Sequence, residues 1–446
     1  MTGMRELRTE LKRSTAPLAA LATLLIYGLT LINQVTWNTG WPDLSTSLRS
    51  FLILLIPVAV AAGAWQGSRE RRAQTEELMA TVSRPTWQRI LTPIAAVAVT
   101  VTATVAVAVT VTGLTTGPGV WRQQVWPAVT IAVGLLALAA AVTVGAGVGR
   151  MTRTNLTAPL LLCVSALGLV VLYGRGAGAW LTMYNPAMKP AQDVGRLRAE
   201  FQQVRAVIST GQSIWLGGLL LTGILLAAAT TARRRLVALT PAAVGALLAV
   251  PFFIAPGVYD GGVFGSPVAY GPDVKALSLY CAPGVPAVCG AGAHEQRVRQ
   301  AAAPAREVLA ALQRLPGAPT RAVEESQYLG RPIPGDVLPL GSAQIAAGLP
   351  DRLRTTAASG LGTRPQCADA DATTVEETDE ASALAGAWLL KSVSTRPFGD
   401  YPSLDEKLQT FLKLAPDEQV RRMAALRVSL LECRPGAMAI ITGAAS

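Results

Sequence analysis

The chain has 446 residues, of which 51% are hydrophobic and 15% are charged, and its mean hydropathy is positive. This composition excludes a single water-soluble core and is typical of a polytopic membrane protein. Residues 1–258 carry 21 Lys and Arg against 8 Asp and Glu, whereas the remainder carries 18 against 20, so the basic excess belongs to membrane-facing loops and calls for no nucleic-acid partner.

The first 14 residues predict an amphipathic helix that precedes the first membrane span. Apolar residues recur there at helical spacing and basic residues lie elsewhere: Met4, Leu7 and Leu11 against Arg5, Arg8, Lys12 and Arg13. Such a pattern suits the lipid interface. The apolar run at 17–35 is too long for a signal peptide and lacks a clear small-residue cleavage site, so we expect it to be retained.

Seven apolar segments approach the roughly 20 residues that a helix needs to cross a bilayer. They are residues 17–35, 48–66, 90–113, 125–148, 156–173, 213–230 and 236–255. The third alternates Ala, Val and Thr as a strand would, but a lone strand in lipid would leave its backbone unpaired, so we predict a helix. The fourth ends with Ala141, Gly145 and Gly149, which predicts a small-residue face for close helix packing.

Arginines between these segments orient the chain, because short loops rich in Lys and Arg stay in the cytoplasm. Arg233, Arg234 and Arg235 give the clearest of these signals. We therefore expect a multi-pass protein of a plasma membrane, with a cytoplasmic N-terminus and with residues 257–446 outside. No acid or base lies centrally in a predicted span, which argues against a proton-coupled carrier.

Residues 174–212 form a longer external segment before the sixth span. Five of its apolar residues recur at helical spacing and predict a surface helix: Val194, Leu197, Phe201, Val204 and Ile208. Residues 181–208 then have two possible roles, a gate at the outer exit or plain packing, between which the sequence does not choose.

Residues 67–89 form a charged insert, GSRERRAQTEELMATVSRPTWQR, between the second and third apolar segments. Glu76 and Glu77 lie early in a predicted short helix, where the helix dipole favours acids. Pro85 ends that helix, because proline lacks a donor and restrains the residue before it. Trp87 and Arg89 follow at the mouth of the next span, a place where aromatic and basic residues anchor helices. We expect the insert to lie on the membrane as a rigid lever.

This insert resembles the coupling helix of type-2 ATP-binding-cassette exporter permeases, through residues 69–72, 75–78, 83–85 and 87–89. The resemblance implies that docking of the ATPase involves Arg69, Arg71, Arg72, Glu76, Glu77, Leu78, Arg84, Trp87 and Arg89. An ordinary cytoplasmic loop that obeys the positive-inside rule is the alternative.

The same resemblance makes residues 1–14 the elbow helix of the family and residues 15–256 its transmembrane domain. It implies a dimer or pseudo-dimer of permeases in the membrane lipid, with a cytoplasmic nucleotide-binding ATPase. The family has six spans and a cytoplasmic C-terminus, so the resemblance covers roughly residues 1–232.

Residues 257–446 predict a mainly helical, disulfide-bonded extracytoplasmic domain, attached to an all-α membrane part of about seven helices. Four cysteines allow three pairings, and we favour Cys281 with Cys289 and Cys367 with Cys433. Cys163 lies in a predicted span, where we expect a small buried apolar residue. Helices are predicted at 295–315, 377–392 and 416–432, loops with short strands at 330–350, and a buried strand at 437–442.

No enzymatic motif accompanies this architecture. The chain has one His, which excludes a two-histidine zinc site, and no phosphate-binding loop for ATP. We expect His294 to be solvated or to cap a helix, and the acidic run at 369–380 to be a solvated face rather than a calcium site. This chain is expected to bind no cofactor, so ATP would bind to the partner ATPase. The function that fits is the permease subunit of an ATP-driven exporter of a hydrophobic or amphipathic substrate; the alternative is a membrane-anchored extracellular ligand-binding or sensor protein.

Overall fold

The structure is a computed structural model of the full chain. It describes residues 15–32, 41–74, 86–115, 126–152, 154, 156–174, 181–187, 201–255, 259–260, 266–267, 269–328, 331–347, 350–363, 372–399, 401 and 403–443. Contacts divide these residues into two compact units, the first ending at Pro272 and the second comprising Phe201 and the residues from Asp273 onward. The amphipathic helix predicted for residues 1–14 lies outside the described residues.

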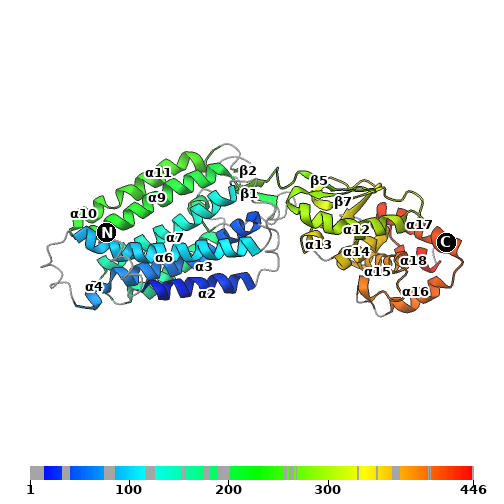
Figure 1. The fold of residues 1–446 in the computed structure, drawn as a ribbon, viewed down its shortest axis with the longest axis horizontal. Helices are drawn as coiled ribbons and strands as arrows, with labels where there is room; N and C mark the ends of the chain where they lie inside the picture. Colours follow the sequence, from blue (N-terminus) through cyan, green and yellow to red (C-terminus); the bar gives the residue numbers. More distant parts are fainter. Residues whose placement is uncertain are drawn as a thin grey trace. The chain divides into compact units, whose positions relative to one another are not determined.

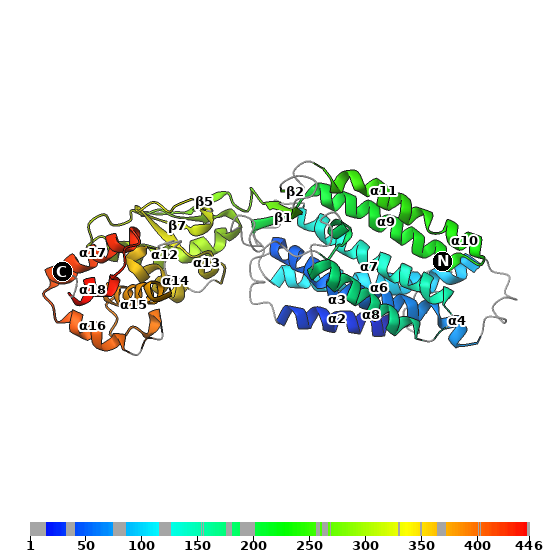
Figure 2. The same cartoon turned by 180° about the vertical axis from the view of Figure 1, so that it is seen from behind.

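The first unit is a bundle of helices, most of them apolar and two of them short and rich in arginine (Figures 1 and 2). They are α2 (Ala16–Ile32), α3 (Trp41–Gly67), α4 (Arg69–Arg72), α6 (Thr86–Thr115), α7 (Trp126–Met151), α8 (Thr157–Gly174), α9 (Ala206–Ala228), α10 (Ala232–Val237) and α11 (Thr240–Phe253). The helix predicted for residues 90–113 is confirmed by α6. Its Thr100 and Thr102 hydroxyls donate to the carbonyls of Ala96 and Ala98 at 2.7 and 2.8 Å, so β-branched polar residues are satisfied within an apolar helix.

Among the described residues, five helices are long and apolar enough to cross a membrane. They cover Leu44–Gly67, Arg89–Thr115, Trp126–Met151, Ala206–Ala228 and Ala232–Phe253. Two further predicted spans coincide with apolar helices that are shorter, Ala16–Ile32 and Thr157–Val171. Five spans of the predicted seven are therefore matched by helices of spanning length, and the direction in which each crosses stays a prediction.

The small-residue face predicted on α7 is confirmed by its contact with α3. A Cβ atom added to Gly145 would clash with the carbonyl oxygen of Val60, and one added to Gly149 would clash with that of Ala64. The backbones of the two helices are therefore in direct contact, which only glycine permits. By contrast Cys163, expected to be buried, is exposed on the surface of α8 and has a free thiol.

In this unit one short strand lies before α9 and three short strands lie after α11. β1 (Gln202–Val204) pairs antiparallel with β4 (Tyr270–Pro272), and β2 (Tyr259–Asp260) pairs with β3 (Ser266–Pro267). The surface helix predicted through Val194, Leu197, Phe201, Val204 and Ile208 is wrong at residues 202–204, which form β1, with Val204 opposite Tyr270. Ile208 does lie in a helix, α9, whereas Val194 and Leu197 lie outside the described residues. A partner strand about 70 residues away overrides the local periodicity.

The second unit contains a mixed four-stranded sheet, of which the sequence predicted only the short strand within residues 330–350. Its strands lie in the order β5 (Leu279–Ala282), β6 (Val288–Ala291), β7 (Arg321–Glu324) and β8 (Val337–Leu340). The β5–β6 pair is antiparallel, and the other two pairs are parallel. β6 and β8 are buried throughout, and four-residue apolar runs of this kind are hard to recognise as strands from sequence.

The helices of this unit pack on the sheet and on one another. They are α12 (Glu295–Leu312), α13 (Ser342–Ala347), α14 (Pro350–Ala358), α15 (Ala372–Leu389), α16 (Leu404–Leu412), α17 (Pro416–Leu431) and α18 (Ala437–Thr442). The helices predicted at 295–315, 377–392 and 416–432 are confirmed by α12, α15 and α17. α12 is the crossover between parallel strands β6 and β7, and it buries Val298, Val308, Leu309 and Leu312 in the core of this unit.

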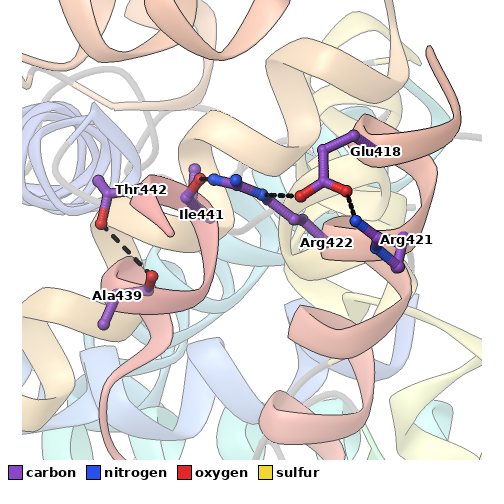
Figure 3. Close-up of polar contacts among 6 residues, drawn as sticks. All are labelled: Glu418, Arg421, Arg422, Ala439, Ile441 and Thr442. Atoms are coloured by element: carbon purple, nitrogen blue, oxygen red, sulfur yellow. Dashed lines mark hydrogen bonds and ion pairs between the residues drawn. The ribbon is translucent and has the colours of Figure 1, made fainter. Parts of the chain in front are cut away.

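The strand predicted at residues 437–442 is wrong, because these residues form helix α18. Gly436 and Gly443 flank the helix with φ of 83° and 81°, a left-handed conformation that glycine adopts without strain. Figure 3 shows Arg422 of α17 reaching across to α18. Its Nε donates to Glu418 at 2.6 Å and its Nη1 to the carbonyl of Ile441 at 2.9 Å, so a cation caps the C-terminal end of this short helix.

The predicted disulfide between Cys281 and Cys289 is confirmed. The two residues face each other in the β5–β6 hairpin, with Cα atoms 4.0 Å apart. Cys433 is also disulfide-bonded, and its predicted partner Cys367 lies outside the described residues.

Candidate functional site

The predicted coupling insert begins where α3 ends. Ser68 interrupts the helix, its hydroxyl donates to the carbonyl of Trp65 at 3.2 Å, and α4 follows as a single turn. Gln74 then has a φ of 52°, a left-handed conformation. Of the predicted docking residues, Glu76, Glu77, Leu78 and Arg84 lie outside the described residues. Trp87 lies in the first turn of α6.

Glu70 is the centre of an ion-pair network at this end of the bundle. Its Oε1 lies 3.5 Å from Nε of Arg89 on α6, and its Oε2 lies 3.2 Å from Nη1 of Arg150 on α7. The three side chains are between 19% and 25% exposed, so solvent screens them only in part. Arg150 is in the last turn of α7, where the helix dipole favours a cation.

Two further arginines of α4 extend the network through backbone carbonyls. Nη2 of Arg71 donates to the carbonyl of Arg150 at 2.7 Å. Nη2 of Arg72 donates to the carbonyl of Trp65 at 2.6 Å, and its guanidinium stacks 3.6 Å from the centre of the Trp65 ring. Desolvation lowers the pKa of Arg72. Both arginines thus satisfy carbonyls at helix ends, the groups that a helix leaves without partners.

The structure therefore brings together three of the predicted docking residues, Arg71, Arg72 and Arg89, and it adds Glu70 and Arg150. Sequence reasoning assigned neither Glu70 nor Arg150 to the docking residues. A signal was present, because Glu70 is the single acid within the run Arg69–Arg72. Through these contacts α4 is bonded to the ends of α3, α6 and α7. A displacement of α4 would therefore be transmitted to three helices.

A second polar cluster lies inside the helical unit. Arg49 on α3 is 0% exposed, and its Nη1 donates to Oε1 of Gln212 on α9 and to the carbonyl of Pro186 at 3.4 Å. Gln212, also 0% exposed, donates to the carbonyls of Met183 and Asn185 at 3.0 and 3.1 Å. Nε and Nη2 of Arg49 have no hydrogen-bond partner in the part of the chain that the structure describes.

Sequence reasoning missed this buried cation, because Arg49 is the second residue of the segment predicted as the second span and passes for an interfacial charge. The helix instead begins earlier, so Arg49 belongs to its interior. An ionisable side chain in such a position is retained for a function or for a specific partner.

The 3₁₀ helix η3 (Leu181–Tyr184) and the residues after it pack among the helices. The Tyr184 hydroxyl donates to the carbonyl of Ala246 on α11 at 2.9 Å. Its ring meets those of Trp215 and Phe253 edge-on, with centroids 5.4 and 4.7 Å away. The described residues of the segment 181–208 thus pack among the helices, and a gating role for the segment stays a prediction.

His294 is neither of the two things expected from the sequence: it is not solvated, and although it stands at the N-cap position of α12, its side chain makes no capping hydrogen bond. It is 2% exposed, its Nδ1 lies 2.9 Å from Oε1 of Glu324, and its ring contacts Phe201. Oε2 of Glu324 accepts from the N–H of Ala291 at 2.8 Å. Burial alone would raise the pKa of Glu324, but hydrogen bonds from His294, Ala291 and Ser342 outweigh it and hold the pKa below its ordinary value.

This pair ties the ends of β6 and β7 together within the second unit, and its burial gives no access to a substrate. No group of three or more His, Cys, Asp or Glu side chains among the described residues could hold a metal ion. Comparison of the chain with protein-family models, with curated proteins and with solved structures found no match.

Proposed function

We propose that the chain is the permease subunit of an ATP-driven exporter whose ATPase is a separate cytoplasmic polypeptide. The observation that carries this proposal is the bridge that Glu70 makes between Arg89 and Arg150. It connects the insert that resembles a coupling helix to two helices of spanning length. An ordinary loop needs no such bridge, whereas a lever needs rigid attachment to the elements that it moves.

In this proposal, ATP binding closes the ATPase dimer beneath two permeases and pushes the insert sideways. The network around Glu70 carries that push into α6 and α7. At the glycine contact between α7 and α3 no side chains interlock, so the two helices can slide along each other there. The substrate is hydrophobic or amphipathic, the N-terminus is cytoplasmic, and the second unit lies outside the plasma membrane.

Charge reversal at the insert tests this function. The double variant Glu76→Lys/Glu77→Lys should reach the membrane at normal levels and abolish the transport-linked stimulation of the partner ATPase. A matched control is Glu406→Lys/Asp417→Lys, which reverses two exposed acids of the second unit. Unchanged stimulation in the first variant, measured as ATP hydrolysis in reconstituted membranes, would remove the coupling role.

A further inference from the structure

A cavity of about 360 Å³ opens on the surface of the second unit. It lies among α14, the 3₁₀ helix η7 (Ser359–Gly362), α15 and α17, and the described residues that line it all belong to this one unit. Its volume is within the range of small-molecule sites, about 300–1,000 Å³. The coupling proposal makes no use of this cavity.

Hydroxyl groups dominate its wall, and most of them have already used their single hydrogen. The hydroxyls of Thr356 and Ser359 donate to carbonyls one turn earlier, at 2.7 and 3.1 Å. Those of Thr363 and Ser429 donate to the carbonyls of Gly360 and Arg434, at 2.6 and 3.3 Å. A hydroxyl that donates in this way keeps its lone pairs, so these four groups offer acceptors to a ligand.

Helix α15 adds four more polar side chains to the same wall, Thr374, Thr378, Asp379 and Ser382. Thr378 and Ser382 lie one helical turn apart and make no hydrogen bond among the described residues. Asp379 contributes a carboxylate, which accepts hydrogen bonds only. The guanidinium of Arg434 at the rim is paired with Glu432 through one of its nitrogens. The Asp379 carboxylate and the four hydroxyls that already donate make hydrogen-bond acceptors the main polar groups of the wall.

The backbone beneath the cavity has an unusual conformation. Gly360, Leu361 and Gly362 have φ of 62°, 56° and 71°, and the left-handed region is costly for a leucine. A Cβ atom on Gly360 would lie 3.2 Å from Oγ1 of Thr363 and 3.3 Å from Oγ of Ser382. The turn thus keeps two hydroxyls of the wall clear of any side chain at residue 360.

We propose that this cavity binds a small saccharide. Sugar hydroxyls donate hydrogen bonds to the four lone-pair acceptors, and a pair of vicinal hydroxyls meets the Asp379 carboxylate. Thr378 and Ser382 both donate to and accept from the ligand, and Val375 and Leu430 present apolar surface to its C–H face. An anionic ligand is disfavoured by the same predominance of acceptors. The site is independent of the proposed transport function, since it uses residues of the second unit alone.

The test is ligand binding to the full chain, purified in lauryldimethylamine oxide because maltoside detergents carry a sugar headgroup. Glucose, galactose, glucosamine and maltose are the probes, with inorganic phosphate as the anionic control, and saturation-transfer difference NMR is the readout. We expect at least one saccharide to bind at millimolar concentration and phosphate not to bind.

Two variants locate the binding. Asp379→Asn should weaken it at least tenfold, and Ser382→Ala should weaken it by a smaller factor without disturbing the fold. Asp417→Asn, the same change on α17 outside the cavity, should leave affinity unchanged. Binding of no saccharide, binding of phosphate alone, or wild-type affinity in both cavity variants would overturn the proposal.

Discussion

The buried contact between Arg49 and Gln212 leads to a prediction whose size follows from the structure. In Gln212→Leu, Arg49 loses its side-chain acceptor while remaining 0% exposed, and two carbonyls lose a donor. A hydrogen bond to a charged group contributes about 1.5–3 kcal/mol. Side-chain hydrogen bonds in helical membrane proteins average about 0.6 kcal/mol each. We therefore expect a loss of about 2–4 kcal/mol in the free energy of unfolding.

A double-mutant cycle separates this reasoning from a simple packing defect. Removing both partners of a buried polar pair is far less costly than removing one, so Arg49→Met/Gln212→Leu should be more stable than Gln212→Leu alone. Ser213→Ala is the matched control, because among the described residues the Ser213 hydroxyl bonds within its own helix, to the carbonyl of Ser209 at 2.8 Å. This change should cost under about 0.5 kcal/mol. The assay is unfolding in mixed micelles. A double variant no more stable than Gln212→Leu would refute the account.

Three other predictions concern the remaining features. Glu70→Gln should cost only about 1 kcal/mol of stability yet lower transport-linked ATP hydrolysis; wild-type hydrolysis would count against the network. Gly145→Ala should destabilise the bundle by about 1–3 kcal/mol, measured by thermal unfolding, through overpacking against Val60. Gly168→Ala should be neutral or stabilising in the same measurement, because a Cβ atom at residue 168 has no neighbour within 4 Å. The carboxylate of Glu324 has a lowered pKa in the folded chain. The stability that it contributes is therefore present above its ordinary pKa of 4.5 and is lost as the pH falls through its folded-state pKa. In calorimetry, the loss of stability on acidification should be smaller in Glu324→Gln than in the wild type.

Sequence reasoning succeeded where the determinants of structure are local. Apolar runs predicted the helices of the first unit, because a segment of that length can satisfy its backbone only internally in lipid. The spacing of Gly145 and Gly149 predicted a packing face, and the α3 backbone lies against it. Cys281 and Cys289, eight residues apart, were correctly paired for the same reason.

It failed where the partner is distant in the chain. Arg49 meets Gln212 across 163 positions, and His294 meets Glu324 across 30. A lone charge at the edge of a span and a lone His at the start of a helix both look solvated until the fold supplies the other group. The α18 segment failed differently, since six apolar residues suit a strand or a helix equally, and the flanking glycines with Arg422 decide in favour of the helix.

Co-purification tests the central claim most directly. The tagged full chain, solubilised gently from its native host, would be analysed for bound proteins by mass spectrometry, beside Glu76→Lys/Glu77→Lys and the control Glu406→Lys/Asp417→Lys. We predict that a nucleotide-binding ATPase accompanies the wild type and the control and is lost from the insert variant. Absence of such an ATPase from all three samples would contradict the exporter and leave the ligand-binding or sensor protein as the leading function.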